Sequence, residues 1–457
     1  MHNQSLFSRF SFRFLSHFSS NLFCRSFSFL LFCLLFITKA SAEPLFTIHG
    51  SNTIGARLAP ALVKDYLLSK GAIDVVVIDL GNNETRVEAM MKGQGGKVSV
   101  EIAAHGSGTG FQGLKSGTAD IAAASRPAKR SEIEDLADFA DLTDKHSEHI
   151  VGIDGLAIII NPNNPIDQLS IKQLGQIFSG EINNWSQLGG RVADIKLYSR
   201  DDRSGTWDSF KRMVLGKEYS LSPNAKRFES NDELSDEVSN DIHGIGFVGL
   251  PSVRRAKLIS ISDGLSKALT PNTLNIATED YALSRRLYFY TDDQPSNENV
   301  IDFITFVEGV LGQGTVADNG FVAQFVESII PESYSDLPQD FKQLTPSQHR
   351  LTVNFRFKQG SAQLDNRALR DIDRLAQFIE THPDKKLVLI GFGDQKKSVE
   401  RAQLLSKLRA MAVRRALVKL GIYPKHSLGY GEQLPVASND RDSGRYKNRR
   451  VEVWLAE

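Results

Sequence analysis

The charge of this chain changes sign at one place in its sequence, and that change constrains the fold more than any other feature. Residues 43–344 carry 28 Lys and Arg against 42 Asp and Glu, a net charge of −14. Residues 345–457 carry 22 against 12, a net charge of +10. The segment 331–348, at the change, holds three prolines and many polar residues. Such asymmetry predicts two separate domains with separate partners, residues 43–330 and 349–457, joined by a linker at 331–348.

The first 42 residues differ in composition from the rest. They contain no acidic residue but four basic ones, Arg9, Arg13, Arg25 and Lys39. An apolar run from Phe27 to Ile37 follows, and Ala40-Ser41-Ala42 supplies small residues at a cleavage position. This is the pattern of a secretory signal peptide, and the run is shorter than the ~20 residues that span a bilayer. We expect residues 1–42 to be removed on export, with an uncleaved membrane anchor as the alternative.

Cysteine and histidine usage excludes several kinds of chemistry. Both cysteines, Cys24 and Cys33, lie in the leader, so the mature chain forms no disulfide and no thiolate site. The ten histidines are scattered without metal-ligand spacing, and no hydrolytic triad is recognisable. We therefore expect no metal, no cofactor and no enzymatic activity. A basic domain could suit a nucleic acid, but in an exported protein an anionic cell-wall polymer fits better.

The first long segment alternates strand-like and helix-like stretches, which argues for an α/β architecture. The strand candidates are Leu45–His49, Asp74–Leu80 and Val98–Ile102. The helix candidates are Arg57–Ser69 and Trp207–Leu215.

Three loops rich in Gly, Ser and Thr stand at strand-to-helix junctions of this segment. They are Gly50-Ser51-Asn52-Thr53, Gly106-Ser107-Gly108-Thr109-Gly110 and Arg203-Ser204-Gly205-Thr206. Hydroxyls and free backbone N–H groups at a helix start favour an anion, and Arg200 adds forked donors that suit phosphate oxygens. Two other interpretations stay open: ordinary helix capping by Ser204 or Thr206, and a dinucleotide fingerprint in Gly108-x-Gly110-x-x-Gly113.

Together with other short motifs, these loops make residues 45–330 resemble the periplasmic phosphate-binding proteins of ABC importers. The other motifs are Ala124-Ser125-Arg126, Gly244-Ile245-Gly246-Phe247-Val248-Gly249, Tyr281-x-Leu283-Ser284-Arg285 and Gly312-Gln313. The resemblance implies a two-lobed periplasmic-binding-protein fold that holds phosphate or a similar oxyanion, with an ABC permease as a partner. We expect the ligand to contact Ser51, Thr53, Ser107, Arg126, Arg200, Ser204, Gly205 and Thr206.

Position 126 bears on ligand choice. Arg126 stands where a well-studied branch of that family has an aspartate that accepts the proton of hydrogen phosphate. Sulfate carries no such proton, so an acceptor discriminates the two anions. Asp202 is an alternative acceptor.

The C-terminal segment predicts a compact two-layer domain with the order β-α-β-α-β. Leu351–Phe357 alternates apolar and polar residues and predicts a half-buried strand. The helices are Ala368–Ile379 and Val399–Leu420, the second ended by Gly421. The remaining strands are Leu387–Ile390 and Val451–Leu455.

One arginine interrupts the apolar stripe of the long helix. Arg409 lies on or beside that stripe, and a partly buried guanidinium requires an anionic partner. Asp394, in the loop after the Leu387–Ile390 strand, is a plausible neighbour. The two form either an internal salt bridge or a site for a zwitterion with both an ammonium and a carboxylate.

The spacing of these residues resembles the OmpA-like peptidoglycan-binding domain over residues 349–457. Asp394, Leu405-Ser406, Arg409-Ala410, Gly429-Tyr430-Gly431-Glu432 and Asn448-Arg449-Arg450-Val451-Glu452 follow the family's order. The resemblance implies that Asp394 and Arg409 hold the diaminopimelate of a peptidoglycan stem peptide, with Asn448 and Arg450 as further candidates. Lys397 replaces a family glycine, and Ala402 replaces a family asparagine.

These observations favour a non-enzymatic envelope protein in the periplasm, associated with the cell wall and the outer membrane. We expect its first domain to bind phosphate and its second to anchor it to peptidoglycan. A structural or adhesion protein whose binding fold takes no phosphate is the first alternative. A phosphatase-like enzyme is the second.

Overall fold

The computed structural model describes residues 44–92, 96–332, 334–395 and 398–456. The expected leader, with Cys24 and Cys33, lies outside the described residues. Within those ranges no single helix is long and apolar enough to cross a membrane. The consecutive helices α10 (Glu298–Glu308) and α11 (Val310–Asp318) meet that test only as a pair bent by 67°, on length and composition alone.

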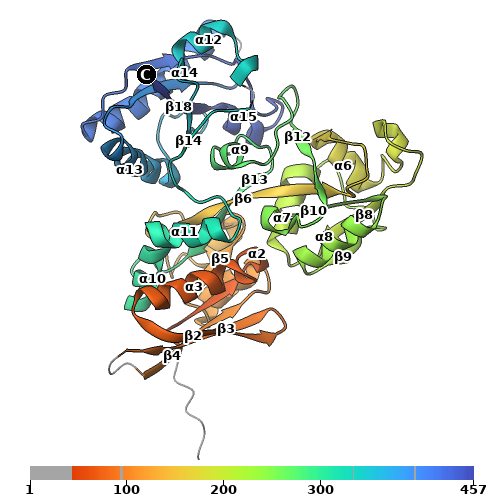
Figure 1. Ribbon diagram of the computed structural model, residues 1–457, viewed down its shortest axis with the longest axis vertical. Coiled ribbons are helices and arrows are strands. Elements are labelled where there is room, and N and C mark those ends of the chain that lie inside the picture. Colours follow the sequence, from red (N-terminus) through yellow and green to blue (C-terminus); the bar gives the residue numbers. More distant parts are fainter. Residues whose placement is uncertain (1–43, 93–95, 333, 396–397, 457) are drawn as a thin grey trace, which may run out of the picture. The chain divides into compact units, whose positions relative to one another are not determined.

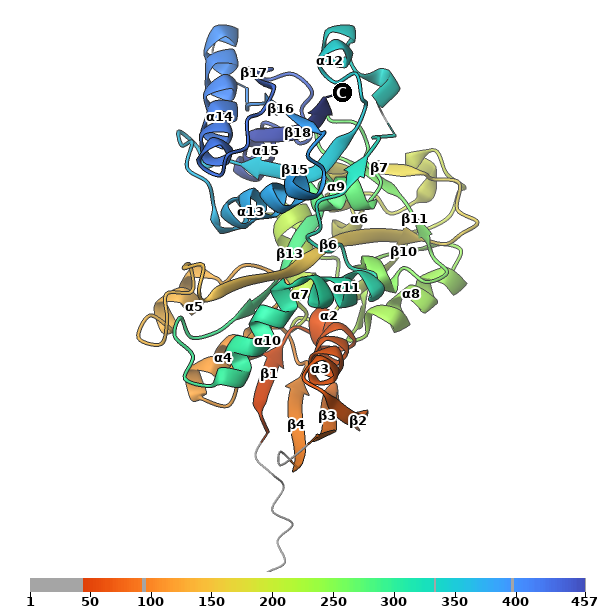
Figure 2. The same ribbon diagram turned by 60° about the vertical axis from the view of Figure 1, so that its left-hand side comes forward.

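One continuous sheet runs through the first domain in the order β2-β3-β4-β1-β5-β13-β6-β10-β8-β9, with β11 beside β6. Its strands are β1 (Phe46–Gly50), β2 (Ala72–Gly81), β3 (Glu84–Met91), β4 (Gly96–Ala103), β5 (Ile121–Ala124), β6 (Glu148–Ile160), β8 (Lys196–Arg200), β9 (Lys226–Phe228), β10 (Gly244–Gly249), β11 (Lys257–Leu258) and β13 (Ser284–Tyr290). Strand β6 is shared, because residues 148–155 pair with β13 and residues 156–160 pair with β10. The sheet therefore belongs to two lobes that meet along β6, as expected (Figures 1 and 2).

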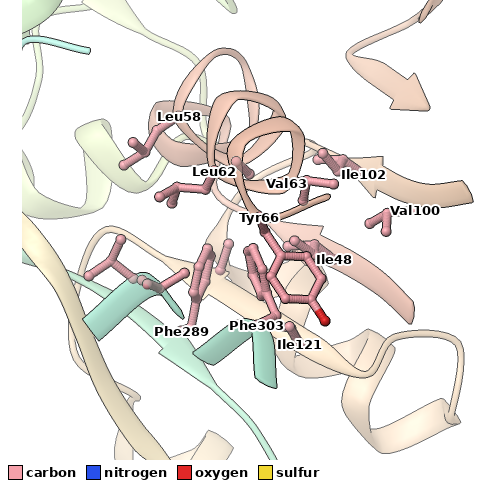
Figure 3. Close-up of a cluster of buried hydrophobic side chains, with 14 of the residues drawn as sticks. Ile48, Leu58, Leu62, Val63, Tyr66, Val100, Ile102, Ile121, Phe289 and Phe303 are labelled. Carbon is pink, nitrogen blue, oxygen red and sulfur yellow. The ribbon is translucent and has the colours of Figure 1, made fainter. Parts of the chain in front are cut away.

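Helix α3 (Leu58–Ser69) covers the sheet of the first lobe. Leu58, Leu62 and Tyr66 recur every four residues, so they share one face of the helix and point toward the strands (Figure 3). They pack with Ile48 of β1 and other buried residues of this core. Burying each such side chain contributes about 1.5–3 kcal/mol, so this face fixes the helix on the sheet.

The remaining helices of the first domain surround the two lobes. The first lobe has α2 (Asn52–Gly55), α4 (Ser107–Ser116), α5 (Arg130–Asp135), α10 and α11. The second lobe has α6 (Ile171–Ser179), α7 (Gly205–Phe210), α8 (Asn231–Asn240) and α9 (Thr273–Ala277), with a small sheet of β7 (Gln168–Ser170) and β12 (Ser260–Ser262). The helix expected at Trp207–Leu215 divides into α7 and a π-helical turn, Lys211–Leu215, which ends at Gly216 with φ of +60°.

The β-rich segment after α3 is a hairpin. Strands β2 and β3 join through Asn82 and Asn83, both with positive φ, which suits the tight turn of a two-residue hairpin. Strand β3 lies between the two strands expected at Asp74–Leu80 and Val98–Ile102. Strand β2 ends the sheet and leaves Val76, Val77 and Leu80 exposed.

The C-terminal domain is a five-stranded sheet in the order β14-β15-β18-β16-β17. Its elements are β14 (Ser328–Ile329), β15 (Arg350–Arg356), α13 (Asn366–Thr381), β16 (Lys386–Gly391), α14 (Val399–Lys419), β17 (His426–Gly429), α15 (Asp442–Asn448) and β18 (Arg450–Ala456). The order β15-α13-β16-α14-β18 is the expected one, whereas β14, β17 and α15 were not predicted. Gly421, with φ of +79°, follows the end of α14 as expected.

The segment 331–348 contains regular structure. It forms a 3₁₀ turn, Tyr334–Asp336, and helix α12 (Gln339–Leu344). Phe341 of α12 packs edge-on against Trp454 and Tyr430 of the C-terminal domain. The domain boundary at 331–348 stays a prediction, but part of this segment packs as a layer of the C-terminal domain.

Strand β15 corrects one prediction. It was expected to be half-buried, yet all seven of its residues are buried. The apolar residues face α13 and α14. On the other face Asn354 and Arg356 bind a segment of the first domain, residues 277–283, which we call the connector. The polar residues that alternate along β15 therefore form a contact surface with the first domain and do not face solvent.

Lys447 gives this contact a pH dependence. Its Nζ donates to the carbonyls of Tyr281 (2.6 Å) and Ala282 (2.9 Å), and burial lowers the pKa of Lys447 to about 7. Between pH 7 and about 10.4 the unfolded chain holds a proton that the folded chain has lost, so stability rises with pH. Relative to a Lys447→Met variant, the free energy of unfolding of the wild type should increase by about 1–3 kcal/mol between pH 7 and 9.

Urea denaturation at both pH values measures this difference. The exposed Lys419→Met is the matched control and should show no such change. An equal difference between wild type and Lys447→Met at the two pH values would contradict the assignment.

Candidate functional site

Three loops from the two lobes converge beside β6 and β13, which we call the hinge strands because β6 runs through both lobes and pairs with β13. Ser51 follows β1, Ser107 begins α4, and Ser204 caps α7, where its Oγ accepts from the N–H of Thr206 (3.2 Å). The hydroxyls of Thr53 and Thr206 lie 3.0 Å apart and join the lobes. Together with Gly205, six of the eight residues expected from the sequence are thus brought together.

Gly205 of the second lobe lies close to two serines of the first lobe. A Cβ atom added there would lie 2.2 Å from Oγ of Ser125 and 2.5 Å from Oγ of Ser107. Ser107 Oγ in turn accepts from the N–H of Ser125 (3.2 Å). Only glycine leaves this space free for another group.

Three buried polar atoms around this space have no hydrogen-bond partner among the described residues. They are Oγ of Ser51, Oγ of Ser125 and Nη1 of Arg285. A buried polar atom without a partner costs about 1–3 kcal/mol, so native proteins contain few of them. Two hydroxyls and a guanidinium are the donor set for an oxyanion.

Arg285 was not among the expected ligands. It lies on β13, and its Nε (2.9 Å) and Nη2 (2.6 Å) donate to Oδ2 of Asp154 on β6. Its Nη2 also lies 3.4 Å from Oγ of Thr53. Burial raises the pKa of Asp154, while the charge of Arg285 lowers it. The available signal was the motif Tyr281-x-Leu283-Ser284-Arg285, which ends on this arginine.

Arg200 lies beside the site with its donors engaged elsewhere. Its Nε donates to the carbonyl of Phe228 (3.1 Å), and its other nitrogens bind Asn231 and the carbonyl of Glu229. Burial lowers the pKa of Arg200 to about 10. In this arrangement Arg200 holds the β9–α8 junction, and direct contact with a ligand stays a prediction.

Arg126 forms ion pairs across the two lobes. Its Nη1 and Nη2 each lie 2.7 Å from Glu132, and its Nε lies 3.1 Å from Asp208 of α7. These carboxylates raise the pKa of Arg126 despite its burial. Asp202, the alternative proton acceptor, is 86% exposed and pairs with Arg227.

The second candidate site lies between β16 and α14. Asp394 and Arg409 are both buried, as the apolar stripe of α14 predicted for Arg409. Nη1 of Arg409 donates to the carbonyl of Phe392 (3.4 Å). Burial lowers the pKa of Arg409 to about 10, with the charge of Asp394 opposing that shift and the charge of Arg449 adding to it. One carboxylate and two guanidiniums therefore lie close together.

Of the Asn-Arg-Arg segment, Arg449 is the residue at this site. Its Nη1 lies 3.2 Å from Oδ2 of Asp394. Asn448 accepts from the N–H groups of Val436 and Ala437, and Arg450 pairs with Glu452 (2.7 Å). Consecutive residues entering a strand point to opposite faces, so only one of two adjacent arginines can reach α14. Reasoning from the sequence named Asn448 and Arg450 and missed Arg449.

Comparisons with known proteins agree with this architecture. Residues 83–308 match the PBP superfamily domain, and residues 356–449 match the OmpA family. The phosphate-binding protein PstS of Borreliella burgdorferi is 30% identical over 229 residues, which cover 48% of this chain and 77% of that protein. The phosphate-binding protein PstS of Staphylococcus saprophyticus is 32% identical over 235 residues, which cover 50% of this chain and 72% of that protein.

A solved structure is also similar. An ABC-type phosphate transport receptor from Vibrio cholerae is 27% identical, covers 61% of this chain and 99% of that one, and superposes with a TM-score of 0.46. The fold and the match of residues 83–308 to the family model define a two-lobed binding protein of the PBP superfamily. Within that class, the chain belongs to the PstS family of phosphate-binding proteins, and it carries an OmpA-family domain after it. Both resemblances found in the sequence are thus confirmed.

Proposed function

We propose that this protein binds inorganic phosphate, or a similar oxyanion, between its two lobes and is held at peptidoglycan by its C-terminal domain. The observation that carries the first half is the set of three buried, unpartnered donors among the described residues: Ser51, Ser125 and Arg285. The relatives named above are binding proteins and not enzymes, and we propose the same for this chain.

A tetrahedral oxyanion suits these donors because it offers acceptors in several directions. The hydroxyls of Thr53 and Thr206 approach from opposite lobes, and Arg285 supplies the positive charge. Ser107, Ser204 and Gly205 complete the predicted contacts, whereas Arg126 and Arg200 act on the shape of the loops. Hydroxyl groups both donate and accept, so they accommodate the proton of hydrogen phosphate without a carboxylate.

The second half of the proposal rests on charge complementarity at Asp394. Diaminopimelate carries an ammonium and a carboxylate, which suit the Asp394 carboxylate and the guanidiniums of Arg409 and Arg449. The net charge of +10 on residues 345–457 adds a weaker attraction to an anionic wall. We propose the periplasm as the location of this role and an ABC permease as the transport partner.

Phosphate titration of the chain without its first 42 residues tests the binding role. We expect calorimetric heat and a melting temperature that rises with phosphate concentration, because a ligand bound only by the folded state stabilises it. Sulfate serves as the comparison and should bind more weakly. Neither heat nor a melting shift at millimolar phosphate would refute the proposal and favour the structural or adhesion role.

A further inference from the structure

The C-terminal domain contacts the first lobe through α13. Nη2 of Arg370 lies 3.2 Å from Glu308 of α10 and donates to the carbonyl of Lys145 (2.8 Å). Nη1 of Arg374 donates to the side chain of Gln324 (3.0 Å). Two basic side chains of one helix thus hold the first lobe.

The same domain contacts the second lobe around α15. Nη2 of Arg441 lies 2.5 Å from Oδ1 of Asp263, and its Nη1 donates to the carbonyl of Met213 (3.2 Å). The backbones also approach closely, since a Cβ atom on Gly264 would lie 2.9 Å from Cβ of Ser438. The domain is therefore bonded to both lobes at once.

A third set of contacts reaches the connector, residues 277–283. Nη2 of Arg350 (2.7 Å) and Nη2 of Arg356 (2.8 Å) bind Asp280, and Nη1 of Arg367 lies 3.1 Å from Glu279. Burial alone would raise the pKa of Glu279, but the charges of Arg286 and Arg367 hold it well below its usual range. Both carboxylates therefore stay ionised and bound.

The connector leads directly into β13, which carries Arg285. Arg285 joins β13 to β6 through Asp154 and contributes an unpartnered donor to the phosphate site. A cavity of about 310 Å³ lies beside it, lined by Arg212 and Asp263 of the second lobe, Arg286 of β13 and Lys447 of α15. The interface thus leaves space next to the hinge strands, where the lobes would move.

We propose that the C-terminal domain regulates the phosphate site: by bonding both lobes and the connector while the lobes touch, it favours the closed arrangement and strengthens phosphate binding. This inference rests on the proposed function. The docked domain and the closed lobes occur together here, with Thr53 against Thr206 and Arg126 against Asp208. Separated lobes cannot keep the contacts of α13 and α15 unchanged, so docking and phosphate binding support each other.

Variants of the Arg441–Asp263 pair test whether docking of the C-terminal domain strengthens phosphate binding. They are made in the chain without its first 42 residues. Arg441→Gln removes the ion pair with the second lobe from the side of the C-terminal domain, and Asp263→Asn removes it from the side of the lobe. Neither residue is among the proposed phosphate contacts. We expect each to weaken phosphate binding about 5- to 150-fold, the usual range of coupling between sites. The control is Arg445→Gln on the adjoining helix α15, whose partner Asp442 lies within the C-terminal domain. It should leave the dissociation constant unchanged.

A second readout distinguishes regulation from a purely structural effect. If docking strengthens phosphate binding, phosphate binding must strengthen docking by the same factor. Phosphate should therefore slow amide hydrogen exchange in residues 277–283 and 442–448 of the wild type, and slow it less in Arg441→Gln. The double reversal Arg441→Asp with Asp263→Arg should restore phosphate affinity if either single variant folds poorly. Unchanged phosphate affinity in the folded single variants would overturn the regulation while leaving phosphate binding intact. A wild-type chain that binds no phosphate would refute both proposals.

Discussion

Gly205→Ala is expected to abolish phosphate binding and to leave the fold intact. The added Cβ would lie within 2.2 Å of Ser125 Oγ and 2.5 Å of Ser107 Oγ, so it would take the space among the proposed donors. Excluding the anion from that space should weaken binding by at least about 100-fold, equivalent to ~2.7 kcal/mol. Calorimetry with inorganic phosphate measures the change, and circular dichroism checks the fold.

A glycine on the neighbouring loop provides the matched control. A Cβ atom on Gly108 would meet no atom within 4 Å, so Gly108→Ala should bind phosphate like the wild type. Ser125→Ala adds no volume and removes one unpartnered hydroxyl, and should weaken binding by about tenfold. Wild-type affinity in folded Gly205→Ala would place the ligand elsewhere.

Loss of either charge at the second site should release the protein from the cell wall. Asp394→Ala and Arg409→Ala each remove one member of a buried charge group, which typically costs about 2–5 kcal/mol of binding. Since about 1.4 kcal/mol is a factor of ten, neither variant should sediment with purified sacculi at moderate salt. Arg401→Ala, an exposed arginine of the same helix, is the control and should sediment like the wild type.

Arg449 and Arg450 separate a ligand contact from a scaffold contact in the same assay. Arg449→Ala should weaken sedimentation of the folded protein, because Arg449 reaches Asp394. Arg450→Ala should lower the melting temperature, because it strips Glu452 of its buried partner. Attraction from the basic surface fades with salt, so the comparison is made above 0.1 M ionic strength. Full retention of folded Asp394→Ala and Arg409→Ala would refute this site.

Local patterns in the sequence were sufficient to predict the helices and strands in which apolar residues repeat regularly over many positions. Helix α3 repeats its apolar residues every four positions, and α14 does so around Arg409 until Gly421 ends it. The Ser-Gly-Thr loops were recognisable because backbone and hydroxyl donors occur together in a few consecutive residues. Short elements without an apolar period of their own, such as β14 and β17, were not recognisable.

Residues whose role depends on a distant partner could not be assigned from the sequence. The spacing around Arg200 resembles an anion site, but nothing local shows that Asn231 and Glu229 engage its donors. Arg285 reads as a strand residue until β6 places Asp154 beside it. Alternation in β15 identified a polar face correctly, but not the connector that buries it.

The polar face of β15 also has a consequence for descent. Asp280 is buried against Arg350 and Arg356 of the C-terminal domain, and Glu279 is shared between Arg367 of that domain and Arg286 of the first domain. A relative without the C-terminal domain would lack Arg350 and Arg356, so Asp280 would lose both of these buried partners. Across the lineage, we expect the acidic dipeptide and the arginines at 350, 356 and 367 to be gained and lost together, which would mark the point at which the two genes joined.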